Sequence, residues 1–152
     1  MGSASPATPI CAAAFALLAI VVGCKSNDAG PPRLCLEMEA SSTLNLHDGE
    51  PHSVALYFYP LENATAFEET DAQELLANSA TLVGMTGRRW DRVVIPGETR
   101  PVEEHLPERT QFVGLVADFY TGPRKQLVSP RCATDAKKKL RLLLLADELR
   151  VE

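Results

Sequence analysis

The stretch that decides the fold is VALYFYPL, residues 54–61, an unbroken run of apolar and aromatic side chains. Branched and aromatic residues favour β-strands, and a run of this length suits a strand better than a helix. Because neither set of alternating positions is polar, we expect a central strand that is covered on both faces. Pro60 has no amide hydrogen and is expected to end this strand.

Other strands are expected on either side of this one. Residues 34–41 and 89–95 alternate between apolar and polar side chains, which is the pattern of a half-buried strand. The Pro-Gly-Glu sequence at 96–98 predicts a turn, and residues 99–106 follow as an exposed strand. QFVGLVADFY, residues 111–120, predicts a second strand that is buried on both faces.

Two segments have helical composition. Residues 65–78 are rich in helix formers, and Thr70 with Gln73 has the spacing of a capping box, so one or two short helices are expected there. Residues 137–152 suit an amphipathic helix by propensity, or strands at 139–145 and 149–151 with a turn between them. Seven or eight short strands in total predict a mostly β fold, an antiparallel two-sheet β-sandwich with a short helical insertion.

The N-terminal segment differs in composition from the rest of the chain, because Lys25 is the first charged residue. Residues 10–22, ICAAAFALLAIVV, are apolar over the length of a signal-peptide core and fall short of the roughly 20 residues that span a bilayer. Val21, Val22 and Gly23 precede Cys24 in a pattern that resembles the bacterial lipobox. The alternative is a buried core segment with an incidental cysteine.

The lipobox resemblance divides the chain into three parts. Residues 1–23 form the lipoprotein signal peptide, residues 24–33 form the lipidated N-terminus and a polar tether, and residues 34–152 form the β-sandwich domain. Cys24 is expected to carry a diacylglycerol and acyl lipid, and several acyl chains give stable membrane attachment. No other cofactor is expected.

The remaining cysteines point to an oxidising compartment. Cys11 leaves with the signal peptide and Cys24 is acylated, which leaves Cys35 and Cys132. An even number of cysteines in an exported chain predicts a disulfide, with two separate thiols as the alternative. No Cys or His spacing is typical of a zinc site, so no metal is expected.

Composition and motifs exclude several kinds of function. The 152 residues carry a net charge of −5, and the basic residues are scattered except for Lys137, Lys138, Lys139 and Arg141, whereas nucleic-acid binding needs a concentrated basic face. There is no phosphate-binding glycine loop and no GxSxG motif.

The acidic residues of the helical segment suggest a solvated face rather than a catalytic cluster, namely Glu68, Glu69 and Asp71. None of the three histidines, His47, His52 and His105, has a Ser or Cys partner in a local nucleophile motif. His47 and His52 could share a metal ion across one loop, although histidines in loops are usually solvated. We therefore expect that the protein has no enzymatic activity.

The order of several short motifs carries a family resemblance. The lipobox at Cys24 is followed by YFYPL, AFEETDAQELL and VVIPGETRPVEEHLPERTQFVGLVADFY. This order resembles the TssJ (SciN) family of outer-membrane lipoproteins of the type VI secretion system. The resemblance implies a transthyretin-like β-sandwich that faces the periplasm and is tethered to the outer membrane. TssJ-like proteins bind the periplasmic C-terminal domain of TssM and form an envelope-spanning complex with TssM and TssL.

The resemblance also implies a partner-binding loop between the first two strands. Here that loop contains Asn45, Leu46, His47, Asp48, Gly49, Glu50 and Pro51. Leu46 is the expected apolar anchor, because an Asp-Gly turn can present a short rigid projection. A connector without a partner is the alternative for this loop. In many Gram-negative bacteria an Asp directly after the lipidated cysteine retains a lipoprotein at the inner membrane. Here Lys25 occupies that position, which favours transfer to the outer membrane. For the whole protein, the alternative function is a periplasmic lipoprotein module that binds a small ligand or cell-wall fragment.

Overall fold

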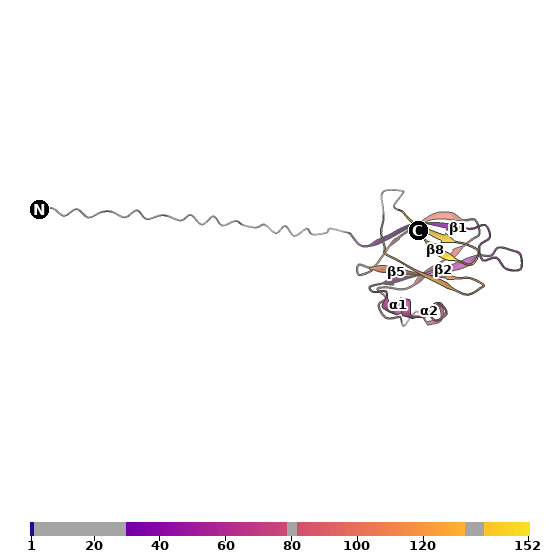
Figure 1. The fold of residues 1–152 in the computed structure, drawn as a ribbon, viewed down its shortest axis with the longest axis horizontal. Coiled ribbons are helices and arrows are strands. Elements are labelled where there is room, and N and C mark those ends of the chain that lie inside the picture. Colours follow the sequence, from indigo (N-terminus) through magenta and orange to yellow (C-terminus); the bar gives the residue numbers. More distant parts are fainter. Residues whose placement is uncertain (2–29, 79–81, 133–138) are drawn as a thin grey trace.

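The computed structural model describes residues 1, 30–78, 82–132 and 139–152. In it, two four-stranded sheets face each other, and two short helices cover the outer side of one sheet (Figure 1). This confirms the prediction of a mostly β sandwich with a helical insertion. The elements are β1 (Arg33–Ala40), β2 (Val54–Leu61), α1 (Thr65–Glu69), α2 (Ala72–Asn78), β3 (Trp90–Val94), β4 (Thr99–His105), β5 (Phe112–Asp118), β6 (Arg124–Val128), β7 (Leu140–Leu144) and β8 (Leu149–Val151).

The sheets have the strand orders β4-β1-β7-β8 and β3-β2-β5-β6. All neighbouring strands are antiparallel except β1 and β7, which are parallel, with Leu36 facing Leu140 and Ala40 facing Leu144. The expected antiparallel arrangement is therefore wrong for this one pair. A parallel pair needs a long crossover connection, and here the intervening strands and helices provide it.

One face of β2 points into the core between the sheets. Val54, Leu56 and Phe58 are buried there against β1 and β5, and the Phe58 ring stacks on Trp90 with ring centroids 5.1 Å apart. The same core receives apolar side chains from all three C-terminal strands of the described chain. Among the described residues, both cores lie between Leu34 and Val151, so residues 33–152 contain a complete core.

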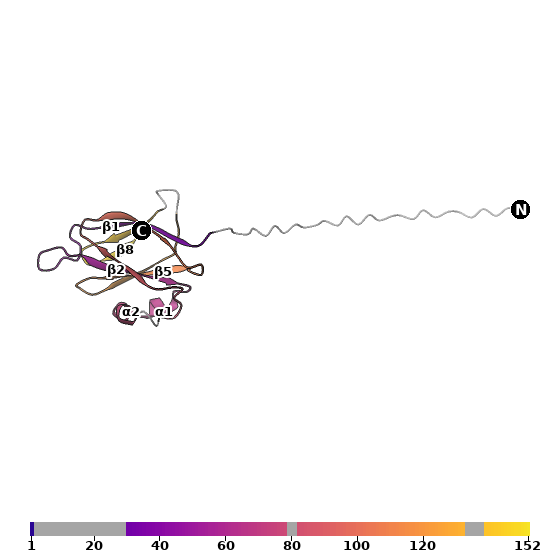
Figure 2. The same ribbon diagram turned by 180° about the vertical axis from the view of Figure 1, so that it is seen from behind.

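The other face of β2 is also buried, as the sequence predicts. Tyr59 and Leu61 pack with Val116 of β5 against Phe67 of α1 and Leu75 of α2. Apolar side chains on both faces of one strand therefore explain why the helices lie over this sheet. In Figures 1 and 2, α1 and α2 lie beside β2 and β5, on the side away from β1 and β8.

Pro60 lies within β2, so the expectation that it ends the strand is wrong. It faces Val113 of β5, and its carbonyl oxygen accepts a hydrogen bond of 2.9 Å from the Thr86 amide. Proline has the φ angle of an extended chain and lacks only the amide donor. The strand therefore continues to Leu61, which forms a bridge with Met85.

Two cations hold the helices on the sheet. The Lys125 ammonium donates to the carbonyl oxygens of Phe67, Glu68 and Thr70 at 3.0, 2.7 and 2.6 Å, which satisfies the C-terminal end of α1. Arg89 donates to the Leu76 carbonyl of α2 at 3.2 Å and to the Tyr59 hydroxyl at 3.2 Å. Burial raises the pKa of Tyr59, and the hydrogen bond from Arg89 opposes this shift.

The N-terminus of α2 is capped differently from the predicted Thr70 and Gln73 pair. Asp71 Oδ1 accepts a hydrogen bond of 2.8 Å from the Gln73 amide, whereas the Thr70 hydroxyl donates to the Ala66 carbonyl at 2.6 Å. The helix begins at Ala72, so Asp71 occupies the capping position. Among the described residues, no helix has the length and hydrophobicity needed to cross a membrane.

The C-terminal segment forms strands rather than a helix. Leu140, Leu142 and Leu144 alternate toward the core from β7, with Leu149 of β8 beside them. β1 needs a neighbour on its second edge, and this tertiary pairing outweighs helix propensity. β6 was not expected, because its sequence RKQLV contains a single buried residue, Val128.

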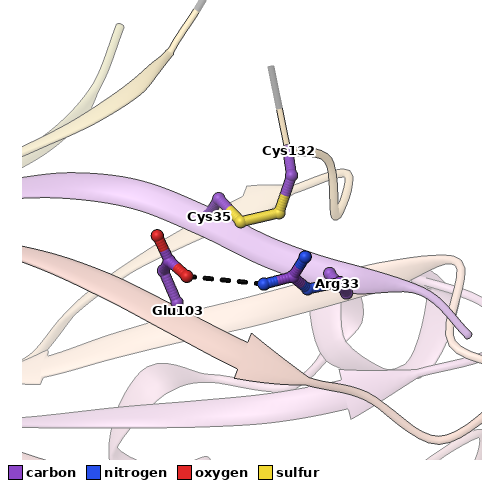
Figure 3. The surroundings of a disulfide bond; sticks show 4 residues. All are labelled: Arg33, Cys35, Glu103 and Cys132. Carbon is purple, nitrogen blue, oxygen red and sulfur yellow. Dashed lines mark hydrogen bonds and ion pairs between the residues drawn. A yellow bond between two sulfur atoms is a disulfide. The ribbon is translucent and has the colours of Figure 1, made fainter. Parts of the chain in front are cut away.

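A disulfide between Cys35 and Cys132 ties β1 to the segment that follows β6 (Figure 3). The two Cα atoms are 4.8 Å apart, and the cysteines are separated by 97 residues. The Cys35 amide also donates to the Arg131 carbonyl at 3.1 Å. Beside the bridge, Arg33 forms an ion pair of 3.4 Å with Glu103 of β4.

Replacing Gly114 by alanine is expected to destabilise the domain by about 1–3 kcal/mol, the usual cost of overpacking a core. A Cβ atom at this position on β5 lies 2.4 Å from Phe67 Cε2. Chemical denaturation of wild type, Gly114→Ala, Phe67→Leu and the double variant measures the effect. The smaller side chain in Phe67→Leu should relieve the clash, so the two costs should not add. Simple additivity contradicts the predicted clash.

Replacing both Cys35 and Cys132 by serine should lower the free energy of unfolding. Closing a loop of this length contributes up to about 4.7 kcal/mol through chain entropy. Chemical denaturation with and without dithiothreitol measures the difference, and the double variant should not respond to the reductant. Equal stability of the oxidised and reduced wild type contradicts a stabilising bridge.

A candidate partner-binding loop

The connection between β1 and β2, residues 41–53, protrudes from one end of the sandwich (Figures 1 and 2). His47 and Glu50 pair within it through two backbone hydrogen bonds of 3.1 and 3.0 Å. Asp48 and Gly49 connect them with φ angles of 52° and 81°, as a tight two-residue hairpin turn requires. The tip is therefore a small hairpin with a defined backbone.

The base of the hairpin is fixed to the domain by Asn45. This residue is 8% exposed and has a φ angle of 48°. Its side-chain amide donates to the Ser53 carbonyl at 3.2 Å, and its side-chain oxygen accepts a hydrogen bond of 2.7 Å from the Tyr120 amide. Leu44 beside it is fully buried. Asn45 thus anchors the loop and is not presented to a partner.

Three stacked rings support the hairpin. The His47 and His52 rings lie 3.7 Å apart with an interplanar angle of 7°, and His47 also stacks on Tyr120 at 4.3 Å. Imidazole lone pairs lie in the ring plane, so the lone pairs of parallel stacked rings do not converge on a shared metal ion. In the described parts of the chain, no group of three or more metal-ligating side chains occurs.

The surface that the loop presents combines an apolar side chain with carboxylates. Leu46 is 45% exposed, and the turn residues that follow it are exposed too, namely Asp48, Gly49, Glu50 and Pro51. His47 is partly covered, and its Nδ1 atom lies 3.5 Å from a carboxylate oxygen of Asp48. The loop can therefore present an apolar side chain, surrounded by carboxylate groups, on a backbone that is already ordered.

Tyr120 is a member of this site that sequence reasoning missed. It lies just beyond β5, is 72% exposed, and contacts the loop through both its ring and its amide. The sequence pattern placed Tyr120 in a strand that is buried on both faces, and this is wrong for Tyr120, because β5 ends at Asp118. Only the tertiary structure shows that its ring meets His47.

The other predicted site residues lie apart from the loop. Cys24 and residues 2–23 of the predicted signal peptide lie outside the described residues. Cys35 and Cys132 lie near the N-terminal end of β1, whereas the loop follows its C-terminal end. The remaining acidic residues and histidine considered for catalysis are exposed on the helical insertion and at the end of β4, namely Glu68, Glu69, Asp71 and His105.

Solved structures of similar fold come from type VI secretion systems. The chain is 26% identical to the crystal structure of the lipoprotein TssJ1 from Pseudomonas aeruginosa, with a TM-score of 0.68 over 81% of this chain and 96% of that one. A chain of a type VI membrane complex matches at 20% identity and a TM-score of 0.66 over 81% and 99% of the two chains.

A third match is a chain of a structure described as the T6SS protein TssM C-terminal domain (869–1107) from EAEC. It has 20% identity and a TM-score of 0.63 over 80% of this chain and 98% of that one. Among curated proteins, no sequence matches the chain.

A family model gives the assignment at the level of sequence. The model for type VI secretion lipoproteins, which carries the names VasD, EvfM and TssJ, matches residues 32–147. The match confirms the resemblance drawn from the sequence motifs and spans nearly the whole sandwich. This chain therefore belongs to the TssJ family of type VI secretion lipoproteins.

Proposed function

We propose that this protein is a lipid-anchored structural component of the type VI secretion membrane complex. Its loop at residues 45–51 binds the periplasmic C-terminal domain of TssM, within a complex of TssJ, TssL and TssM, and Cys24 tethers the complex to the outer membrane. The observation that carries this proposal is the preformed hairpin with an exposed Leu46 at one end of the sandwich. The role is structural and requires no catalytic group.

The choice of partner is supported by family membership and by the matched structures. The family is that of type VI secretion lipoproteins, and two matching chains come from structures described as a type VI membrane complex and as the TssM C-terminal domain. These descriptions belong to the matched proteins, and we extend them to this chain because the fold agrees over about four-fifths of its length.

The fixed shape of the loop favours binding. Ordering a flexible loop on association costs free energy, and a loop that is already ordered avoids much of that cost. Here the backbone pairing of His47 with Glu50, the Asn45 hydrogen bonds and the ring stack hold the hairpin before any partner arrives. Leu46 can then insert into an apolar pocket as the central anchor.

The direction of β1 supports this arrangement at the membrane. Cys24 lies nine residues before Arg33, where β1 begins, and the loop lies at the other end of the same strand. A nine-residue tether reaches at most about 30 Å, and β1 extends roughly 26 Å further. A lipid on Cys24 therefore holds the domain near the membrane with the loop directed away, and Lys25 after Cys24 favours the outer membrane.

Replacing Leu46 by aspartate should weaken binding to the TssM periplasmic domain by about tenfold or more, the usual cost of losing an interface anchor. Calorimetry with a soluble fragment of residues 33–152 measures the dissociation constant. Leu46→Met keeps an apolar side chain of similar size and serves as the matched control. Unchanged thermal unfolding should accompany the loss, because Leu46 is exposed. Wild-type affinity in Leu46→Asp contradicts the proposed anchor.

Replacing Cys24 by serine should release the protein from the membrane fraction or leave it unprocessed, and should abolish type VI secretion. The reason is that the thioether-linked lipid has no attachment point. Cys11→Ser, a change within the signal peptide, is the matched control and should keep both anchoring and secretion. Membrane fractionation, mass measurement of the mature N-terminus and a secretion assay give the result. Full secretion by Cys24→Ser counts against a lipid-dependent role.

A further inference from the structure

The helices cover only part of the outer face of the sheet β3-β2-β5-β6. Outward-facing Tyr59 and Leu61, in the C-terminal half of β2, are fully buried with Phe67 and Leu75 of the helices. Toward the start of β2 the outward position is Ala55, which is only partly buried. The end of this face nearest the loop therefore lacks the cover that the helices give to the other end.

Apolar side chains lie on this uncovered part. Val93 of β3, Ala55 of β2 and Asp118 of β5 are in register across three adjacent strands. Val93 is 61% exposed, and Ile95, which directly follows β3, is 54% exposed. Both are branched apolar side chains that are not required by either core.

The uncovered face is continuous with the loop. Tyr120, two residues after Asp118, stacks on His47, and the Gly97 amide donates to the Ser41 carbonyl at 3.1 Å, which ties the turn after Ile95 to the start of the loop. Among the described residues, the large exposed apolar side chains comprise Leu46, Val93, Ile95 and Tyr120 at this end, with Met1 and Val83 elsewhere. Four of the six thus gather around one end of the sandwich.

We propose that Val93 and Ile95 extend the partner-binding surface of the loop onto the outer face of the sheet, where they contact the same TssM periplasmic domain. This inference rests on the proposed function and names the second half of its interface. We call the exposed set Leu46, Tyr120, Val93 and Ile95 the apolar strip. A strip that continues from a preformed loop onto a flat sheet can bury more apolar surface in one partner than the loop tip alone.

The charged residues that border the apolar strip indicate which side chains the partner surface should carry. Asp91 and Asp118 are exposed beside the strip, and Glu50 lies on the loop. In the described chain none of these three carboxylates forms an ion pair with a basic side chain. The complementary surface is apolar at its centre with lysine or arginine at its edge. An anionic membrane fits poorly, because these carboxylates are repelled by it and the tether leaves from the opposite end.

The test is the double variant Val93→Lys, Ile95→Lys in the soluble fragment of residues 33–152. Lysine is well tolerated on the exposed face of an edge strand, so thermal unfolding should stay close to wild type. Neither residue takes part in the stacked rings or the Asn45 hydrogen bonds, so the loop keeps its shape. Val83→Lys, at an apolar position that is 74% exposed beside the helices, is the matched control.

Calorimetry against the TssM periplasmic domain should show about tenfold weaker binding for the double variant, as expected for losing two interface contacts, and wild-type affinity for Val83→Lys. Wild-type affinity in the double variant, with loss in Leu46→Asp, confines the interface to the loop and overturns the extension alone. Absence of binding by the folded wild type overturns the proposed function itself. Sedimentation gives a further outcome. If the wild type self-associates and the double variant does not, while the double variant still binds TssM, the apolar strip contacts a second copy of this chain. That result also overturns the proposed extension.

Discussion

The structure depends on the burial of β2 on both of its faces. Val54, Leu56 and Phe58 fill the space between the sheets, so a second sheet must lie opposite. Tyr59 and Leu61 point the other way, and leaving them in water would forfeit the stabilisation of two large side chains. The helical insertion meets this need, and Lys125 and Arg89 satisfy the carbonyl groups that two such short helices leave unpaired.

The two ends of the sandwich are specialised in different ways. At the N-terminal end of β1, the Cys35–Cys132 disulfide and the Arg33–Glu103 ion pair hold together segments that are far apart in the sequence. At the opposite end, hydrogen bonds and stacked rings hold a loop that places Leu46 in solvent. In the proposed function, the first end secures the domain close to the lipid anchor, while the other end offers a shaped surface for a partner.

Local patterns in the sequence were sufficient for some elements and insufficient for others. VALYFYPL and QFVGLVADFY predicted central strands because their apolar residues occupy both faces, and the Asp48-Gly49 pair predicted a tight turn through its backbone preferences. The sequence did not predict β6, because RKQLV lacks the alternation of apolar and polar residues that is typical of a half-buried strand. One of its polar groups, the Lys125 ammonium, binds carbonyl oxygens of the helical insertion. The parallel β1–β7 pair and the Tyr120 contact join distant residues, and no local pattern encodes such pairings.

The parallel pairing of β1 with β7 has a consequence for the order of events in the cell. β1 is the first strand of the described chain to be synthesised, yet one of its two neighbours is β7, the second-to-last strand of the described chain. Pairings between distant segments form slowly, because the whole intervening loop must close first. The sheet therefore stays incomplete until the last strands have emerged. A chain that cannot fold early stays unfolded for longer, which suits passage through an export channel if the N-terminus is the signal peptide that we propose.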